Sequence, residues 1–216
     1  MKNRFDLIVF DWDGTLIDSV HWITECLQQA ARDCEMEVPD ARLARSVIGL
    51  SLDRAMSTLF PHASKAELPP LIAAYHRYYD VKILGQGDLF DGVPQLLDDL
   101  LEQGYQLAVA TGKSRNGLNQ ALSSTGYTDW FHATRAANET ASKPNPLMLL
   151  QLMEELGSPP ERTLMVGDSV HDLEMANNAN IGAIGVVTGA NDRDELLALN
   201  PVLVLNQTSD LRELLL

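Results

Sequence analysis

Two aspartates near the start of the chain have the residue type and spacing for proton or metal chemistry. Asp11 and Asp13 lie in the stretch Asp11-Trp12-Asp13-Gly14-Thr15, directly after an apolar run at residues 7–10. At the end of a strand, Asp11 could act as a nucleophile or a metal ligand, and Asp13 could move protons. A turn rich in aspartate and glycine, with no chemical role, is the alternative for this stretch taken alone.

A second acidic pair follows another apolar run, at residues 163–166. Asp168 would lie at the end of that strand as a candidate metal ligand, and Asp172 would lie one helical turn later on the same face. Asp172 could instead form an acidic capping box with Ser169, three residues earlier. His171 points elsewhere on that helix, and we expect it at the surface.

A hydroxyl and a lysine complete the set of candidate residues. Thr111 and Gly112 follow residues 107–110, and a hydroxyl with free amides ahead of a helix forms an anion site. Ser114 could simply cap that helix, and Leu107 stands where a nucleotide P-loop needs glycine. Lys143 precedes a proline, which restricts it to extended geometry and could aim it inward, although a surface lysine is the alternative.

These candidates all follow elements of one expected sheet. Apolar runs at residues 7–10, 106–110, 163–166 and 181–187 are typical of buried parallel strands. Helical segments with start and stop signals separate them, at residues 93–103, 114–124 and 146–156. The alternation predicts an α/β protein with a doubly wound parallel sheet, a Rossmann-like core, whose ligand site lies at the carboxyl ends of the strands.

The stretch after the first acidic pair breaks this alternation. Residues 21–37 and 65–80 have helical patterning, prolines punctuate the segment, and no strand is convincing. We therefore expect an α/β catalytic core at residues 1–17 and 88–216, with an inserted all-helical cap domain at residues 18–87.

Charge and composition limit the partners. The chain of 216 residues has 16 basic and 30 acidic side chains, a formal net charge of −14. Such a chain repels nucleic acid polymers and anionic membranes, so an anionic ligand needs a local positive site. No apolar run is long enough to span a membrane, and Cys26 and Cys34 are too far apart on one helix to pair. We expect a cytoplasmic protein with reduced thiols, and the sequence does not indicate its oligomeric state.

The order of acidic pair, hydroxyl, lysine and acidic pair resembles the haloacid dehalogenase-like hydrolase superfamily at all four of its motifs. Within it, residues 90–93 (Phe-Asp-Gly-Val) and 108–113 (Ala-Val-Ala-Thr-Gly-Lys) are similar to stretches of the phosphoglycolate phosphatase and β-phosphoglucomutase group. The resemblance implies a phosphatase that hydrolyses a small phosphorylated metabolite. Because the helical insertion directly follows the first acidic pair, we also hypothesise that the cap is a lid, with hinges near Gly85 and Gly87.

The resemblance also implies roles for the motif residues. Asp11 would attack phosphorus to form an aspartyl-phosphate, and Asp13 would protonate the leaving oxygen and then activate water. Thr111 and the Gly112 amide would hold the phosphoryl oxygens, and Lys143 would offset their charge.

The implied cofactor is Mg²⁺, which prefers oxygen ligands. Asp11, the carbonyl of Asp13 and Asp168 would bind it, and Asp172 would do so directly or through a water molecule.

Other activities stay open as alternatives. In the phosphoglucomutases an arginine follows a Gly-x-Ser turn in the cap; here Leu52 falls at that place, which argues against a mutase, and a pyrophosphatase is a further alternative. Dehalogenases of the superfamily lack an acid at the position of Asp13. Receiver-type signalling modules also combine Asp, Thr and Lys but are about half this length. The substrate is not determined, and the cap residues Arg45, Arg54, His76 and Arg77 are candidates for reaching the site.

Overall fold

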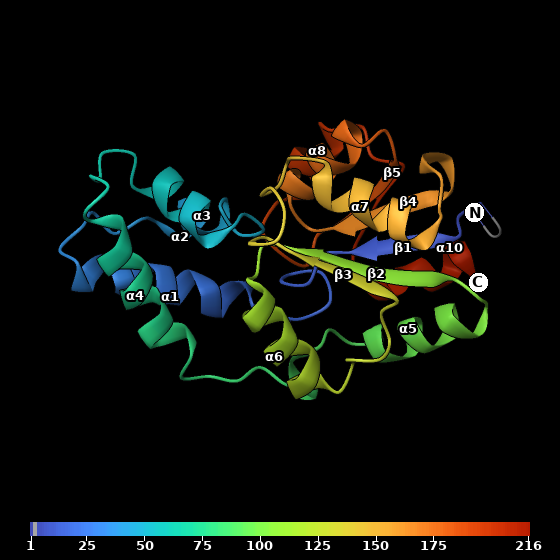
Figure 1. Ribbon diagram of the computed structural model, residues 1–216, viewed down its shortest axis with the longest axis horizontal. Coiled ribbons are helices and arrows are strands. Elements are labelled where there is room, and N and C mark those ends of the chain that lie inside the picture. The colour runs from blue at the N-terminus through green and yellow to red at the C-terminus, as the bar shows by residue number, and fades with distance from the viewer. Residues whose placement is uncertain (2–3) are drawn as a thin grey trace.

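The computed structural model describes residues 1 and 4–216, and in that part of the chain six parallel strands form one sheet (Figure 1). The strand order is β3-β2-β1-β4-β5-β6. Their bounds are β1 Leu7–Phe10, β2 Gln106–Thr111, β3 Ala133–Ala136, β4 Thr163–Gly167, β5 Gly182–Val186 and β6 Leu203–Leu205. Phe10 pairs with Val109 on one side and Val166 on the other, so these neighbouring strands end at the same edge.

The central strand is buried on both faces. Ile8 and Phe10 belong to one apolar cluster, and Leu7 and Val9 belong to another on the opposite face. Alternate residues of a strand point to opposite faces, so a strand covered on both sides is a continuous apolar run. This is the pattern that predicted the strand.

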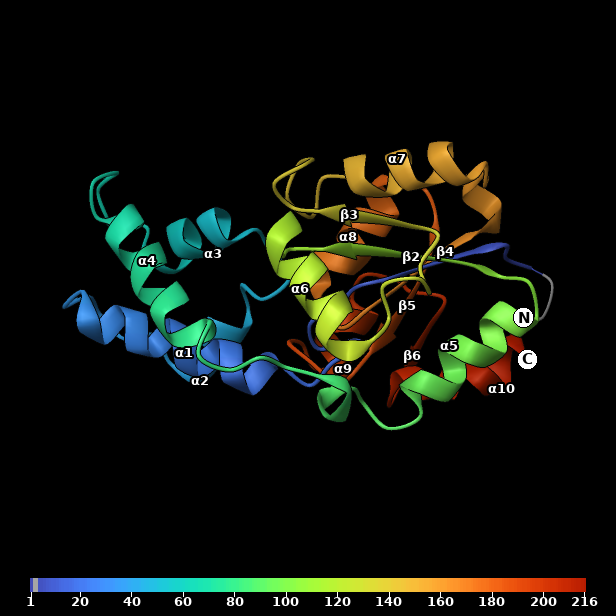
Figure 2. The same cartoon turned by 60° about the horizontal axis from the view of Figure 1, so that its bottom comes forward.

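Helices cover both faces of the sheet (Figure 2). One apolar cluster takes side chains from α5 (Val93–Glu102), α6 (Arg115–Thr125) and α10 (Arg212–Leu215). The cluster on the other face takes side chains from α7 (Leu147–Leu156), α8 (Val170–Asn178) and α9 (Arg193–Leu197). The doubly wound α/β fold expected from the sequence is confirmed.

The helical insertion follows β1 and forms an apolar cluster of its own. It contains α1 (Val20–Asp33), α2 (Ala41–Arg45), α3 (Leu52–Leu59) and α4 (Leu68–Tyr79), which lie beside the sheet in Figure 1. Of these helices, α2 and α3 were not predicted. The expected helix at residues 21–37 ends at Asp33 because the chain turns there, with Glu35 in the left-handed region at φ +53°.

The two connections between the insertion and the sheet run side by side. The Asp18 amide donates to the Asp88 carbonyl at 2.8 Å, and Ile17 forms an isolated bridge with Leu89. The one-turn 3₁₀ helix η1 (Gln86–Asp88) lies at this return point, and η2 (Pro160–Arg162) and η3 (Thr208–Leu211) precede β4 and α10. The domain boundaries at residues 17/18 and 87/88 stay a prediction.

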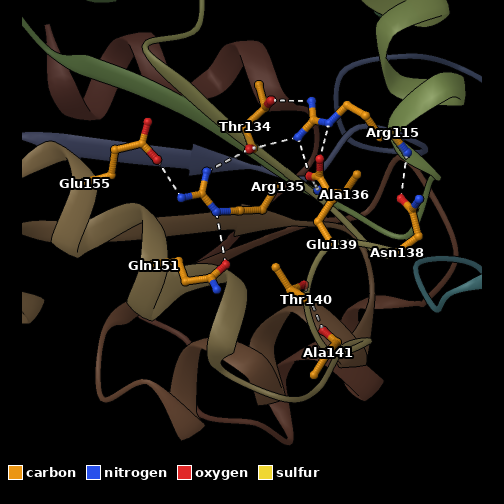
Figure 3. Close-up of polar contacts among 10 residues, drawn as sticks. All are labelled: Arg115, Thr134, Arg135, Ala136, Asn138, Glu139, Thr140, Ala141, Gln151 and Glu155. Carbon is orange, nitrogen blue, oxygen red and sulfur yellow. Dashed lines mark hydrogen bonds and ion pairs between the residues drawn. The ribbon is translucent and has the colours of Figure 1, made fainter.

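Strands β3 and β6 were not predicted because they lie at the edges of the sheet. The sequence of β3 is Ala-Thr-Arg-Ala, which lacks the apolar run of the central strands. Its Thr134 carbonyl accepts hydrogen bonds from Arg115 at 3.1 Å and Arg135 at 3.0 Å (Figure 3). These arginines are themselves paired with Glu139 and Glu155 at 2.5 Å. Charged side chains therefore take up the hydrogen-bonding capacity of this carbonyl at the open edge of the sheet. Charged residues at an edge strand commonly prevent another strand from adding to the sheet.

Among the residues that the structure describes, no helix combines the length and the apolar character needed to cross a membrane.

Helix α7 provides a matched test of the core. Leu152 is fully buried and Leu150 is 45% exposed. We expect Leu152→Ala to lower the free energy of unfolding by about 2–5 kcal/mol, because truncation leaves a cavity. Leu150→Ala should lower it by about 0.5 kcal/mol or less. Urea denaturation of both variants measures the difference, and equal losses would contradict the assignment of this helix face to the core.

Candidate active site

Three buried carboxylates converge at the carboxyl edge of the sheet. Asp11 follows β1, Asp168 follows β4, and Asp172 lies in the first turn of α8. One oxygen of each lies within 4.8 Å of the others, and all three residues are buried, at most 1% exposed. The structure thus brings together Asp11 and Asp168, the strand-end residues of the two acidic pairs, although they are 157 positions apart in the sequence.

Lys143 reaches this acidic group from the loop between β3 and α7. It is fully buried, with Nζ 2.8 Å from Asp11 Oδ1 and 2.6 Å from Asp172 Oδ1. The preceding loop is tied to the start of α6, because the Arg115 amide donates to Asn138 and its guanidinium pairs with Glu139 (Figure 3). Lys143 therefore points inward, as its place before a proline suggested.

One ammonium does not neutralise three carboxylates. Burial raises the pKa of Asp11 well above its ordinary value, and the charge of Asp172 raises it further, against the opposing effect of Lys143. Burial and the charge of Asp172 raise the pKa of Asp168 to about 7. For Lys143, burial lowers the pKa, but Asp11 and Asp172 outweigh this effect and raise it.

Local hydrogen bonds orient the carboxylates. Asp168 accepts from the Thr15 hydroxyl at 2.7 Å and from the Ala190 amide at 2.8 Å. A Cβ on Gly189 would lie 1.9 Å from Asp168 Oδ2, so only glycine permits this approach. The Asp172 amide donates to Ser169 Oγ at 3.3 Å and the Ser169 amide donates to Asp172 Oδ2 at 3.2 Å, which together form the predicted capping box, while Asp172 Oδ1 contacts Lys143. The capping box is thus confirmed, and the metal-binding role of Asp172 stays a prediction.

The donor set fits a divalent cation. Asp11 Oδ1 is buried, and the Lys143 ammonium at 2.8 Å, which also contacts Asp172, is the positive charge beside it among the described residues. Clustered carboxylate oxygens with unbalanced negative charge are the ligands that hard cations such as Mg²⁺ prefer. Asp11, Asp168 and Asp172 are the residues that could hold such an ion.

The Asp13 side chain lies apart from this cluster of acids. Its Oδ1 accepts from the Ser19 hydroxyl at 2.7 Å, and its Oδ2 pairs with Lys113 Nζ at 3.0 Å. Lys113 also donates to the Tyr79 hydroxyl of the cap at 2.6 Å. Ser19 and Lys113 were not predicted as partners of Asp13, nor was Tyr79 as a partner of Lys113. Of these residues, Lys113 directly follows Thr111-Gly112 and therefore lay next to a motif that could have revealed it.

The Thr111-Gly112 turn lies under the cap. Thr111 is fully buried at the end of β2, and Ser114 caps α6 as predicted by accepting from the Gly117 amide at 3.2 Å. A Cβ on Gly112 would lie 2.4 Å from the Leu50 carbonyl and 2.5 Å from that of Gly49. The cap backbone therefore rests directly on the turn predicted to bind anions.

Further contacts join the cap to the core. The Ser51 amide donates to Ser142 Oγ at 2.9 Å. His171 Nε2 lies 2.8 Å from the Ser46 carbonyl, so this partly buried histidine contacts the cap. In the sequence it had been expected at the surface.

A cavity of about 650 Å³ lies between cap and core, next to Asp13. Trp12, Asp13 and Lys113 line it from the core, and Leu52, Tyr75, His76 and Tyr79 line it from the cap. Of the four cap residues that were candidates for reaching the site, His76 lines this cavity. Arg45, Arg54 and Arg77 are exposed, and Arg77 pairs with Asp33 at 3.0 Å.

The fold and these motifs define a class of enzyme. Residues 8–186 match the haloacid dehalogenase-like hydrolase family, and the chain belongs to this family. Membership of a hydrolase family argues against the receiver-type alternative.

Similar proteins with a known name include phosphatases. The chain is 37% identical over 210 residues to the protein named "probable phosphatase IndB" of Dickeya dadantii, covering 94% of this chain and 90% of that protein. It is 30% identical over 227 residues to a phosphoglycolate phosphatase of Vibrio vulnificus, covering 100% of this chain and 98% of that one. A crystal structure of β-phosphoglucomutase from Clostridium difficile matches with a TM-score of 0.83 at 21% identity, over 96% of this chain and 93% of that one, which supports the fold.

The contact of Gly112 with the cap can be tested. We expect Gly112→Ala to force the Gly49-Leu50 backbone away and to speed hydrogen exchange of the Ser51 amide by about tenfold or more. This factor corresponds to the free energy that overpacking typically costs. Gly117→Ala, in α6, is the matched control, because its Cβ would meet nothing closer than Ser114 Oγ at 3.4 Å. Unchanged exchange at Ser51 in Gly112→Ala would contradict the contact.

Proposed function

We propose that this chain is a Mg²⁺-dependent phosphatase that hydrolyses a small phosphate monoester through an aspartyl-phosphate on Asp11. The observation that carries the proposal is the convergence of Asp11, Asp168 and Asp172 on one buried point with Lys143 beside them. A phosphate monoester is anionic and repels an attacking carboxylate, so such a site needs positive charge next to its nucleophile.

In the first step, a carboxylate oxygen of Asp11 attacks phosphorus, and the bond from phosphorus to the ester oxygen breaks. Lys143, in contact with Asp11, offsets the negative charge of the phosphoryl oxygens. Thr111 and the Gly112 amide are proposed to hold those oxygens, because a hydroxyl and free amides ahead of α6 favour an anion.

Asp13 is proposed to move both protons. As an acid it gives its proton to the departing ester oxygen, and as a base it takes a proton from the water that attacks the aspartyl-phosphate. The phosphorus–oxygen bond to Asp11 then breaks, which releases phosphate and restores the Asp11 carboxylate. The Ser19 hydroxyl, at 2.7 Å, orients Asp13 for both transfers.

Asp11, Asp168 and the carbonyl of Asp13 are the proposed Mg²⁺ ligands, with Asp172 bound directly or through water. When bound, the ion supplies positive charge that stabilises the transferring phosphoryl group. The pKa of Asp168, raised to about 7 by burial and by Asp172, supports this proposal, because a carboxylate cluster with excess negative charge favours a cation.

The cap is proposed to act as a lid. Its loop at residues 49–51 rests on Gly112 and donates to Ser142, so the docked cap covers the carboxylates. A docked lid excludes bulk water from the aspartyl-phosphate. Rotation of the cap about a hinge near Gly85 and Gly87 would open the site to substrate.

Phosphoglycolate is the first substrate to test, because it is the compound in the name of the Vibrio relative. A mutase or a pyrophosphatase is the alternative within the family. Leu52, at the cavity where the mutases place an arginine, favours water over a second phosphate ester as the acceptor.

The reaction can be tested on the purified protein. With Mg²⁺ it should release phosphate from phosphoglycolate or from an aryl phosphate. Asp11→Asn and Asp13→Asn should each lower this rate by several orders of magnitude, since they remove the nucleophile and the proton carrier. Asp129→Asn, an exposed site, is the control. Full activity of Asp11→Asn would refute the mechanism.

Metal binding can be tested without turnover. At a free concentration about 100 times its Kd, Mg²⁺ should stabilise the fold by about 2.7 kcal/mol, which raises the Tm by about 5–10 °C. Asp168→Asn should lose most of this rise, and Asp129→Asn should keep it at the same ionic strength. An equal rise in all three proteins would point to a general ionic effect and away from this site.

A further inference from the structure

The loop between β3 and α7 carries two neighbouring residues with different tasks. Ser142 accepts a hydrogen bond from the Ser51 amide of the cap at 2.9 Å. Lys143 places its Nζ 2.8 Å from Asp11, the proposed nucleophile. Because the two residues are adjacent in the chain, a shift of this loop would move the cap contact and the ammonium group together.

Arg115, the first residue of α6, holds the beginning of this loop (Figure 3). Its amide donates to Asn138 Oδ1 at 2.8 Å, and its guanidinium donates to the two carboxylate oxygens of Glu139 at 2.7 and 2.5 Å. The same guanidinium donates to the hydroxyl and to the carbonyl of Thr134 in β3, at 2.7 and 3.1 Å. The planar fork of an arginine gives such bonds a fixed direction. Arg115 therefore joins a helix, a strand and the loop at one point.

Glu139 fixes the loop backbone from within. Its Oε2 accepts a hydrogen bond from the Ala136 amide at 3.2 Å, and the next amide, of Ala137, donates to the Lys113 carbonyl at 2.8 Å. Hydrogen bonding from Arg115 lowers the pKa of Glu139, so this side chain is a charged carboxylate at neutral pH. These contacts set the direction in which the loop leaves β3.

Protection of the sheet edge does not account for this arrangement. Arg135 of the same strand also pairs with a glutamate, Glu155, at 2.5 Å, and it donates to Gln151 at 3.1 Å. Both of these side chains lie in α7, and among the described residues no hydrogen bond of Arg135 reaches the loop. The side chains of this pair are 21% and 48% exposed, against 27% and 36% for Arg115 and Glu139. The edge thus carries two comparable ion pairs, of which one holds the loop.

The proposed reaction makes an anchored loop necessary. Lys143 lies between two carboxylates, with Asp11 at 2.8 Å and Asp172 at 2.6 Å. Once Asp11 is bonded to phosphorus it is no longer a free carboxylate, and Asp172 would draw the ammonium away from the phosphoryl oxygens. A displacement of about 1 Å can lower a rate by about 100-fold, so the backbone of Lys143 has to hold the side chain at the reacting group.

We propose that Arg115 and Glu139 are positioning residues: their ion pair fixes the loop at residues 137–143, which keeps Lys143 at the phosphoryl group and Ser142 against the docked cap. This inference rests on the proposed function. Neither Arg115 nor Glu139 lines the cavity between cap and core, so both act through the loop. Loss of the pair should slow the reaction and loosen the cap contact while the sheet stays folded, since a partly exposed ion pair contributes little to stability.

The test compares matched variants of the two ion pairs at the sheet edge. With an aryl phosphate and Mg²⁺, Arg115→Met and Glu139→Gln should each lower kcat by about 10- to 100-fold and change KM by less than about threefold. The reason is that Lys143 acts on the phosphoryl group during its transfer. Arg135→Met and Glu155→Gln, the controls, should keep kcat within about twofold of the wild type. Arg115→Lys, which keeps the charge without the fork, should recover part of the loss.

A measurement without turnover separates the loop from the proposed chemistry. Hydrogen exchange of the Ser51 amide, which donates to Ser142, should be about tenfold faster in the two loop variants and unchanged in the two controls. Glu139→Gln keeps the shape of the side chain, so it decides the question even if Arg115→Met folds poorly.

The outcomes divide clearly. Ser51 exchange at the wild-type rate in the loop variants overturns the proposal. An equal loss of kcat in loop and control variants, or no loss in either, also overturns it. A wild-type protein without turnover would instead refute the proposed phosphatase function, and the exchange rates would still decide whether the ion pair holds the loop.

Discussion

The burial of three carboxylates around one lysine is the interaction on which this structure depends. Like charges removed from water repel each other strongly, and each loses its hydration. The chain offsets this cost with the Lys143 ammonium, the Thr15 hydroxyl and the Ala190 amide, and the two apolar clusters beneath the site stabilise the fold as a whole. The remaining negative charge is the physical reason for proposing a cation at this site.

The topology makes this concentration of charge attainable. Parallel strands deliver their carboxyl ends to one edge, so residues following β1 and β4 become neighbours without any local sequence relation. The loop after β3 adds Lys143, and its ties to Arg115 keep that loop at the edge (Figure 3). The site thus rests on a rigid sheet, and its loops are held by polar contacts.

The cap turns an open edge into an enclosed cavity. The backbone of the cap comes so close to Gly112 that no side chain fits between them. The cap also contributes the Tyr79 hydroxyl, which accepts a hydrogen bond from Lys113. The two lysines therefore serve different acids: Lys143 contacts Asp11 and Asp172, whereas Lys113 contacts Asp13. In a chain of net charge −14, these two buried ammonium groups are local positive charges at the proposed site, although the neighbouring aspartates outnumber them.

Local sequence determined the central strands, the flanking helices α5, α6, α7 and α8, and the candidate residues at the strand ends, whereas α9 and α10 were not predicted. Both faces of β1 are buried, which leaves a continuous apolar run, and Ser114 and Ser169 mark helix starts through their own hydroxyls. The edge strands β3 and β6 were missed because solvent and polar neighbours replace the apolar pattern there. The pairing of Asp13 with Lys113, and of Lys113 with Tyr79 34 residues away, could not be predicted. Only tertiary structure decides such pairs, because it is the docking of the cap on the sheet, and no spacing along the chain, that brings these side chains into contact.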